Sequence, residues 1–463
     1  MRPVLALVGR PNVGKSTLFN VLTRTRDALV ADFPGLTRDR IYGDADLDGH
    51  SVIVIDTAGI GVEDDYFFKL TAQQSERAMA EADLILFMVD ARAGRTAADD
   101  DVAVRVRQSG KPVLLLVNKS EGLNADLAAA EFQRFGFADV VAISSSHGEG
   151  IRELKESVVG RLALNDLQSP ASPEEGIHIA VVGRPNVGKS TLVNRILGEE
   201  RVLVFDAPGT TRDSIYIPFQ RGEQAYVLVD TAGVRRRQRV EDMIEKFSIA
   251  KTLQAIAAAN VVLLVMDAQE GITDQDASLA GYIVESGRAL VLVINKCDGL
   301  SADQKLKLER DLDLKLHFLN FAKIHLISAR HGTGVGNLFE SILRAYDSSI
   351  RDLSTPELTR LLESALIAHQ PPLVHGRRIK LRYAHQGGKS PPVVVIHGNQ
   401  TREIPGAYRL YLENVFRREL NLEGTPLRME FRTGENPFKG RKNPLTARQI
   451  QKRKRLKRHL KGK

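Results

Sequence analysis

Short runs of aliphatic residues recur along the chain, and more polar stretches of helix length separate most of them. Five runs occupy residues 4–8, 52–55, 84–89, 113–117 and 140–143, and five more occupy residues 179–182, 226–229, 261–266, 290–294 and 324–327. Runs that are apolar throughout, without alternation, are typical of strands buried on both faces of a parallel sheet. The pattern therefore predicts the α/β fold class, with two mostly parallel sheets covered by helices on both faces.

The pattern changes after about residue 349. An amphipathic helix is predicted over 356–370, strands over 379–383 and 393–397, a helix from Pro405, and a strand near 427–431. This α-β-β-α-β order predicts a third, smaller α+β domain. A polar, proline-bearing stretch separates the two large repeats and predicts a linker. The predicted boundaries are 1–164 and 177–349 for the two large domains, 165–176 for the linker, 350–438 for the small domain and 439–463 for a tail.

One eight-residue motif follows the first strand of each large repeat. It has the form G-x-x-x-x-G-K-S, and it occurs as Gly9-Arg10-Pro11-Asn12-Val13-Gly14-Lys15-Ser16 and as Gly183-Arg184-Pro185-Asn186-Val187-Gly188-Lys189-Ser190. Such a loop cradles phosphate with its backbone N–H groups, and its lysine reaches the outer phosphates. The serine hydroxyl is suited to hold Mg²⁺ at the start of the next helix, whose positive end faces the anion. The duplicated motif predicts two phosphate-binding sites.

A second motif lies at the same distance from each loop. Asp56-Thr57-Ala58-Gly59 recurs 174 residues later as Asp230-Thr231-Ala232-Gly233, the spacing that also separates Gly9 from Gly183. The Asp56 and Asp230 carboxylates are suited to hold Mg²⁺ through water, and the N–H groups of Gly59 and Gly233 to meet a γ-phosphate. Upstream, Thr37 and Thr211 are the hydroxyls expected to close onto Mg²⁺ when that phosphate is present.

The base is indicated by a third motif. Asn295-Lys296-Cys297-Asp298 ends a predicted strand, and an aspartate there can accept both N–H donors of the guanine edge, which adenine lacks. Ser328-Ala329 would add a backbone N–H to the guanine oxygen. The first repeat departs from this pattern, with Asn118-Lys119-Ser120-Glu121 and Ser144-Ser145. The sequence therefore predicts GTP binding that is weaker or less selective in the first repeat.

These elements, in order and twice, resemble the TrmE–Era class of translational GTPases. Two tandem copies followed by a small α+β domain narrow the resemblance to the double-GTPase Der (EngA) family, over almost the whole chain. The resemblance implies a KH-like fold for the small domain. It also implies a role in maturing the large ribosomal subunit, with that subunit and its rRNA as partners.

The hydrolytic step is expected to be slow. Ras-like enzymes place a glutamine directly after the second motif to orient water, whereas this chain has Ile60 and Val234, which cannot form hydrogen bonds through their side chains. The resemblance implies a K⁺ ion held by Asn12 and Asn186, and therefore faster turnover in K⁺ than in Na⁺. The residues expected to act on the transferred phosphoryl group are Lys15, Lys189, Thr37, Thr211, Gly59 and Gly233.

The positive charge is concentrated at the C-terminus. The net charge is +8, and residues 439–463 contain 12 Lys or Arg and no acidic residue, which leaves −4 for residues 1–438. Such a block favours binding to a polyanion such as rRNA, with a solubilising tail as the alternative. No apolar run reaches the ~18 residues needed to span a bilayer, the first strand begins at once, and Cys297 is the single cysteine. We expect a cytoplasmic monomer with no membrane partner.

Several alternatives stay open from sequence. A nucleotide kinase would have no use for the guanine motif, a TrmE-like enzyme of tRNA modification would end in a cysteine motif, and a membrane-associated GTPase could use the basic tail. Cys297 is expected to pack, and His147 and His331 to be structural. Arginines at 235–237 and 239 are either a solvated loop or a contact with RNA or a neighbouring domain. No G-x-x-G quartet, the nucleotide clamp of KH modules, occurs in residues 350–438.

Overall fold

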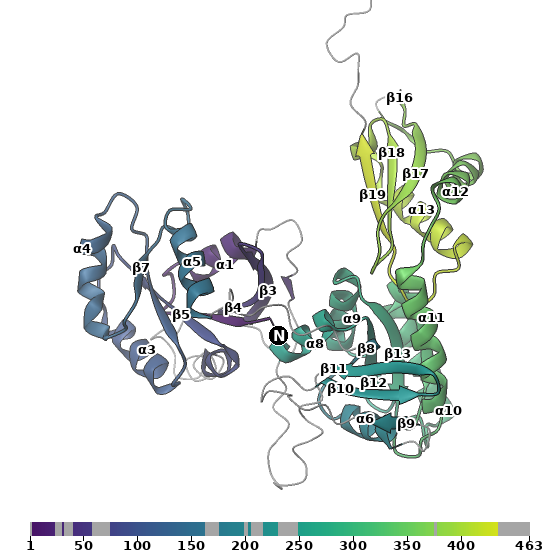
Figure 1. Ribbon diagram of the computed structural model, residues 1–463, viewed down its shortest axis with the longest axis horizontal. Helices are drawn as coiled ribbons and strands as arrows, with labels where there is room; N and C mark the ends of the chain where they lie inside the picture. Colours follow the sequence, from purple (N-terminus) through teal and green to yellow (C-terminus); the bar gives the residue numbers. More distant parts are fainter. Residues whose placement is uncertain are drawn as a thin grey trace, which may run out of the picture. The chain divides into compact units, whose positions relative to one another are not determined.

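A computed structural model describes the fold of residues 2–23, 30–31, 40–57, 75–162, 176–198, 202–204, 216–229, 249–374 and 377–433 (Figure 1). By its internal contacts the chain divides into two compact units. Unit 1 comprises Met1–Arg351, Gly388–Pro392 and Leu420–Leu427, and unit 2 comprises Asp352–Gly387, Val393–Glu419 and Arg428–Lys463. Unit 1 holds both large repeats.

The first repeat forms a mixed sheet whose described strands have the order β2-β3-β4-β1-β5-β6-β7. Strand β1 is central and pairs in parallel with both β4 and β5, whereas β3 runs antiparallel to β4. The strand bounds are β1 Val4–Val8, β2 Val30–Ala31, β3 Arg40–Leu47, β4 His50–Thr57, β5 Leu84–Asp90, β6 Val113–Asn118 and β7 Val140–Ala142.

The second repeat forms a sheet of the same design, with the order β9-β10-β11-β8-β12-β13-β14 among its described strands. Here β8 is central between β11 and β12, and β10 runs antiparallel to β11. The bounds are β8 Ile177–Val182, β9 Val202–Val204, β10 Tyr216–Arg221, β11 Gln224–Val229, β12 Val261–Asp267, β13 Ala289–Asn295 and β14 Lys323–Leu326. The predicted α/β class with two mostly parallel sheets is confirmed.

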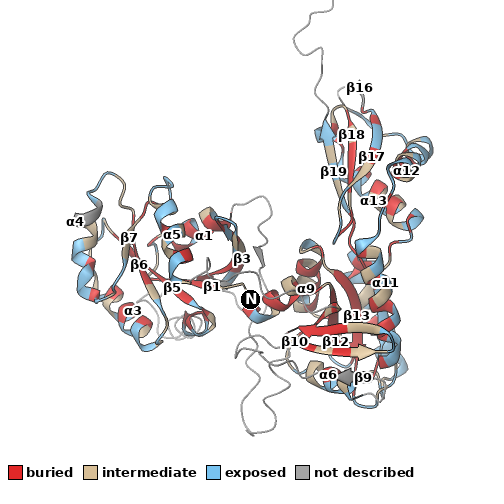
Figure 2. Cartoon of the chain, viewed as in Figure 1, coloured by how far each residue is buried: buried red, intermediate tan, exposed pale blue. Residues whose placement is uncertain are grey.

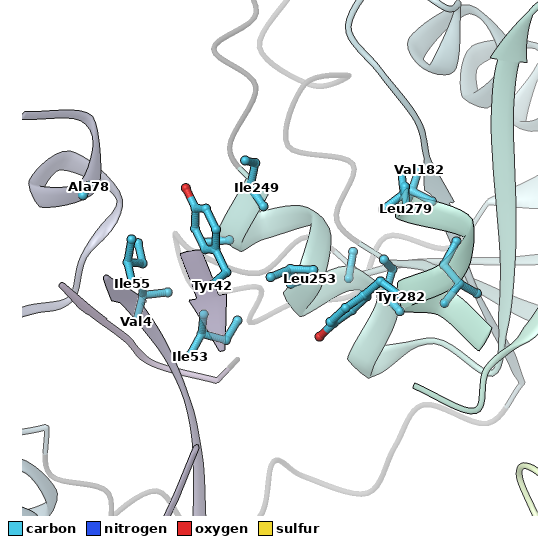
Figure 3. Close-up of a cluster of buried hydrophobic side chains, with 14 of the residues drawn as sticks. Val4, Tyr42, Ile53, Ile55, Ala78, Val182, Ile249, Leu253, Leu279 and Tyr282 are labelled. Carbon is cyan, nitrogen blue, oxygen red and sulfur yellow. The ribbon is translucent and has the colours of Figure 1, made fainter. Parts of the chain in front are cut away.

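Helices follow the strands and bury the sheets' aliphatic side chains. In the first repeat they are α1 Lys15–Thr23, α3 Ala97–Gln108, α4 Ala125–Ala130 and α5 Ile151–Arg161; in the second they are α6 Lys189–Leu197, α8 Ile249–Ala258, α9 Asp274–Glu285, α10 Ala302–Lys315 and α11 Leu338–Ile350. Strands β1, β5, β12 and β13 are buried along their whole length (Figure 2). Figure 3 shows part of this core, with Tyr42 and Ile53 of the first sheet and Leu279 and Tyr282 of α9.

Unit 2 carries the small α+β fold. Its three described main strands have the order β17-β18-β19, with β18 Val393–Gly398 parallel to β19 Arg428–Thr433, and α12 and α13 pack together. Helix α12, Thr355–Ala368, begins at the Ser354 cap with Pro356 in its first turn, and α13 covers Gly406–Glu419. Strand β17 is Leu381–Gly388, so the prediction of 379–383 was too early and too short, and the short pair β15 Leu373–Val374 and β16 Arg377–Arg378 was not predicted. The α+β order is confirmed, whereas the domain boundaries stay a prediction.

Within the described ranges, every helix falls short of the length and apolar character that crossing a bilayer requires.

Candidate functional site

The two phosphate loops connect the central strand of each sheet to the next helix, β1 to α1 and β8 to α6. Ligands of such sheets bind beyond the carboxyl ends of the strands, which is where both loops lie. Two equivalent residues of each loop have positive φ, Asn12 (66°) and Gly14 (101°) in the first, and Asn186 (63°) and Gly188 (97°) in the second, where Gly183 (150°) does so as well.

Glycine is required at the second loop glycine for a steric reason as well. A Cβ atom on Gly14 would lie 2.3 Å from the side-chain nitrogen of Asn118, and one on Gly188 would lie 2.3 Å from that of Asn295. The same amides donate to the loop backbone, Asn118 Nδ2 to the Val13 carbonyl at 2.7 Å and Asn295 Nδ2 to the Val187 carbonyl at 2.8 Å. The phosphate motif and the base motif are thus joined directly in both repeats.

The loop lysine is turned inward in the first repeat. The side chain of Lys15 is buried, and its ammonium donates to the carbonyls of Gly9 at 3.1 Å and Arg10 at 2.9 Å. Burial lowers the pKa of Lys15 to about 8, against the opposing effect of the Asp56 charge. Lys189 donates to the Arg184 carbonyl at 2.7 Å in the second repeat. Both ammonium groups therefore lie against carbonyl oxygens of their own loop.

Asp56 and Ser16 fit a magnesium site. Asp56 is the last residue but one of β4 and pairs with Leu7 of β1, and the Ser16 side chain hydrogen-bonds its carboxylate. Burial raises the pKa of Asp56, and among the described residues its Oδ1 atom is shielded from solvent and has no hydrogen-bond partner. A hydroxyl and a carboxylate with a free oxygen are the hard donors that Mg²⁺ prefers. Mg²⁺, when bound, would neutralise charge on the phosphates.

The other predicted contacts of the transferred phosphate fall outside the described residues. These are Thr37, Ala58, Gly59, Ile60, Thr211, Asp230, Thr231, Ala232, Gly233 and Val234. Thr57 is described, and its hydroxyl donates to the Leu7 carbonyl at 2.6 Å. Ser190 lies in the first turn of α6. The roles of all these residues stay predictions.

The base pocket of the first repeat surrounds Glu121. The Ser144 hydroxyl donates to Glu121 Oε2 at 2.7 Å, and the Arg92 guanidinium lies 2.8 Å from Oε1. The hydrogen bond from Ser144 is the main reason why the pKa of Glu121 lies below its ordinary value. Both N–H and hydroxyl of Ser145 donate to Asn118 Oδ1 at 3.0 Å. All the predicted residues of this pocket lie together, and both oxygens of Glu121 have partners.

The base pocket of the second repeat surrounds Asp298. A hydrogen bond from the Ser328 side chain lowers the pKa of Asp298, with a smaller effect from His331, whose Nε2 lies 3.6 Å from the carboxylate. The Ala329 N–H donates to Asn295 Oδ1 at 2.9 Å. Cys297 directs its thiol to the Ile294 carbonyl at 3.1 Å, which supports a packing role. The predicted guanine residues therefore converge at one end of β13.

Two pairs of aspartates were missed by the sequence prediction. Asp90 and Asp267 end β5 and β12, and each accepts from the lysine of the base motif, Lys119 at 2.6 Å and Lys296 at 2.5 Å. Asp99 and Asp276 are fully buried at the starts of α3 and α9 and lie next to the loop arginines, Arg10 at 3.3 Å and Arg184 at 3.1 Å. Both pairs recur at one spacing in the two repeats, which is the signal that could have revealed them.

Comparisons with known proteins agree with this geometry. A family model described as 50S ribosome-binding GTPase matches residues 4–119 and 178–296, and a model described as the C-terminal KH-domain-like region of EngA bacterial GTPases matches residues 353–432. The chain is 58% identical to GTPase Der of Thioalkalivibrio sulfidiphilus and 56% identical to GTPase Der of Teredinibacter turnerae, each over 100% of both chains.

Solved structures match parts of the chain. The G domain of the Thermotoga maritima FeoB iron transporter is 26% identical over 35% of this chain and 99% of its own, with a TM-score of 0.29. Aquifex aeolicus Era bound to GDP and aluminium fluoride is 25% identical over 55% of this chain and 92% of its own, with a TM-score of 0.27. TM-scores this low carry no conclusion about function.

Proposed function

Because this chain belongs to the GTPase Der family, we propose that it is a switch whose GTP-bound and GDP-bound states differ in affinity for the large ribosomal subunit. The chain is a GTPase, so its substrate is GTP and its products are GDP and phosphate. The observation that carries the proposal is the joining of phosphate loop and guanine motif through Asn118 and Asn295, in two repeats that match a family described as ribosome-binding. We place this monomeric factor in the cytoplasm, acting in large-subunit maturation.

We assign a separate role to each group of residues at the two sites. Lys15 and Lys189 would exchange their loop carbonyls for the outer phosphates, which turns a neutral contact into a charge-assisted one. Ser16 and Asp56 would hold Mg²⁺ in the first site, with Ser190 and Asp230 in the same roles in the second. Glu121 and Asp298 would accept from the guanine edge. Thr37, Thr211, Gly59 and Gly233 would complete the sites when the γ-phosphate is present.

The K⁺ ion belongs to the proposal as well. Asn12 and Asn186 are held in the left-handed region, at the turn of each phosphate loop. An added cation beside the transferring phosphoryl group would stabilise the charge that develops there, in place of the glutamine that Ile60 and Val234 cannot supply. We expect faster turnover in KCl than in NaCl at equal ionic strength, and equal rates in the Asn12→Ala, Asn186→Ala double variant. Equal turnover of the wild-type chain in KCl and in NaCl would contradict the proposed K⁺ site.

The ribosomal part is tested by co-pelleting. The purified chain is centrifuged with large ribosomal subunits in GDP or in a non-hydrolysable GTP analogue, with and without residues 439–463, at two salt concentrations. We expect association with the analogue only, and a loss with salt that is smaller in the truncated chain because fewer phosphate contacts remain. Equal binding in both nucleotide states would overturn the switch and leave a GTPase with a general polyanion anchor.

A further inference from the structure

Three stacked rings lie on the small sheet of unit 2. The rings of Tyr383 on β17 and His397 on β18 are nearly parallel, at 5°, with centroids 4.5 Å apart. The His385 ring, also from β17, lies 5.1 Å from His397 at 25°. Ring contacts of this geometry restrict the side-chain conformations. Tyr383 nevertheless keeps 44% of its surface exposed. The rings form a rigid and accessible aromatic surface.

The alternation of the strands places these rings on the side of the sheet that faces away from its helix. Neighbouring residues of a strand point to opposite faces. On β19, Phe431 lies under the guanidinium of Arg409 from α13, at 5.2 Å, so the next residue, Arg432, points the other way. His397 pairs with Arg432 in the β18–β19 register, and its neighbour Ile396 is fully buried. Tyr383, His397 and Arg432 thus form one row across the sheet.

The chemistry of this row suits an unpaired nucleotide. Aromatic rings stack with any nucleobase, and a guanidinium can contact the backbone phosphate beside it. The Arg432 side chain is 59% exposed and pairs with Glu430 at 2.8 Å through one of its terminal nitrogens, and a guanidinium has five N–H donors in all. His397 stacks on both Tyr383 and His385, so it supports the Tyr383 ring.

The stacked rings, together with the basic segment, favour RNA over an acidic protein surface or a lipid headgroup as the occupant, because only a nucleic acid offers both planar bases and phosphates. The basic segment that starts at Lys439 begins six residues after β19 ends, and the G-x-x-G clamp of KH modules does not occur in residues 350–438. A chain that contacts RNA through this domain therefore needs another site for the bases, and a sheet face with stacked rings is how other single-strand-binding folds provide one.

We propose that the ring face, defined as Tyr383, His385, His397 and Arg432, binds single-stranded RNA by stacking an unpaired base on Tyr383, with Arg432 contacting the neighbouring phosphate. The inference rests on the proposed function only in naming rRNA as the natural source of that strand. Binding of a free RNA strand can be measured without ribosomes, so the RNA-binding inference and the proposed ribosomal switch can fail separately.

The test uses the full-length chain and a 12-nucleotide RNA with 2-aminopurine at its centre. The chain contains no tryptophan, so fluorescence excited beyond tyrosine absorption comes from the probe alone. Binding is measured at raised salt, where the contribution of the basic tail is weakened. We expect quenching of the probe by the wild-type chain, because its base stacks on a ring.

Variants then locate the contact. Tyr383→Ala should weaken binding by about 5- to 150-fold, the effect of losing one stacked base, and should abolish the quenching. Tyr383→Phe keeps the ring and should bind within about twofold of wild type. Leu410→Ala, an exposed position on α13, is the matched control and should bind as wild type. GTP binding and the far-ultraviolet circular dichroism of each variant check that it is folded.

Two outcomes would overturn the inference. One is equal affinity and equal quenching in wild type and Tyr383→Ala. The other is an equal loss for single-stranded RNA and for a duplex of the same length, because stacked base pairs cannot reach the rings. If the strand binds as expected but co-pelleting with ribosomes does not depend on nucleotide, the inference stands and the proposed switch falls.

Discussion

The two large repeats share their phosphate loops residue for residue, yet the structure surrounds these loops differently. In the second repeat, Arg184 donates to Asp276 at 3.1 and 3.2 Å and pairs with Glu270 at 2.8 Å. In the first, Arg10 meets Asp99 at 3.3 Å without hydrogen-bond geometry, and Ala93 stands where the second repeat has Glu270. The second loop is therefore held by three contacts to carboxylate and the first by one.

In the base pockets, by contrast, the carboxylate of the first repeat has the additional charged contact. Glu121 is engaged by Arg92 as well as by Ser144, whereas the residue equivalent to Arg92 in the second repeat is the uncharged Gln269. A guanine that binds Glu121 has to displace or share the Arg92 contact. Neighbouring charges thus decide how firmly an identical phosphate loop is held and how free the base-motif carboxylate beside it is, and we expect the two sites to differ in affinity for this reason.

The largest effect is expected from removing a loop lysine. Lys15→Ala and Lys189→Ala should each slow hydrolysis in their own repeat by about 100- to 1,000-fold, because one preorganised cation on the transferred phosphoryl group is lost. Single-turnover hydrolysis by each variant then measures the rate of the repeat that is not substituted. We expect more activity at limiting GTP from Lys15→Ala than from Lys189→Ala, since the second repeat has the aspartate.

Lys305→Ala, on the exposed face of α10, is the control and should leave both rates unchanged. Equal residual rates in the two loop variants would contradict the prediction that the second repeat is more active at limiting GTP.

Exchanging the acidic residues of the base motif should have the next largest effect. Asp298→Glu should weaken GTP binding in the second repeat by about tenfold, because the added methylene moves the carboxylate from the guanine donors. Glu121→Asp should raise the preference for GTP over ATP in the first repeat. Each is measured by competition titration in a chain whose other repeat carries the loop lysine substitution. Unchanged selectivity in both variants would show that these carboxylates do not read the base.

A smaller effect is expected from Arg92. Arg92→Ala should strengthen GTP binding in the first repeat by a few-fold, because it frees one oxygen of Glu121 from a largely exposed ion pair. Gln269→Ala in the second repeat and Arg152→Ala, which breaks the Glu156 pair on α5, are matched controls without an expected change. A weaker affinity in Arg92→Ala would show instead that the ion pair orients Glu121 toward guanine.

The smallest effect concerns Cys297, which is specific to the second repeat. Burial raises the pKa of this thiol, so its thiolate fraction at pH 8 is below that of an exposed cysteine, and alkylation by iodoacetamide should be slow and speed up about tenfold per pH unit up to that pKa. GTP should slow it further in wild type and not in Lys189→Ala. Mass spectrometry gives a direct reading because the chain has one cysteine. Protection that persists in Lys189→Ala would place the nucleotide elsewhere.

The sequence predicted most of the sheets because their central strands are aliphatic throughout. Strand β3 was missed because Asp44 and Asp46 interrupt it, and a strand paired antiparallel near the sheet edge need bury only one face. Motif spacing identified the residues that are predicted to meet phosphate and base, and the described ones lie together in each repeat. The same spacing test, applied outside the known motifs, would have paired Asp99 with Asp276, but their contact with a loop arginine needs the fold, because one aspartate in a first helical turn looks like an ordinary cap.

Asp276 both caps helix α9 and holds the phosphate loop, and this has a consequence for the motions of the second repeat. Its Oδ2 atom accepts from the N–H and hydroxyl of Thr273 to close the start of α9, while the same carboxylate holds Arg184 of the phosphate loop. Fraying of the first turn of α9 therefore removes the Asp276 contacts of the loop and leaves Glu270 as the one described carboxylate on Arg184, and a nucleotide that orders the loop must, by thermodynamic linkage, oppose the fraying. Amide protons at the start of α9, which belongs to none of the nucleotide motifs, should exchange more slowly with solvent deuterium when GTP is bound.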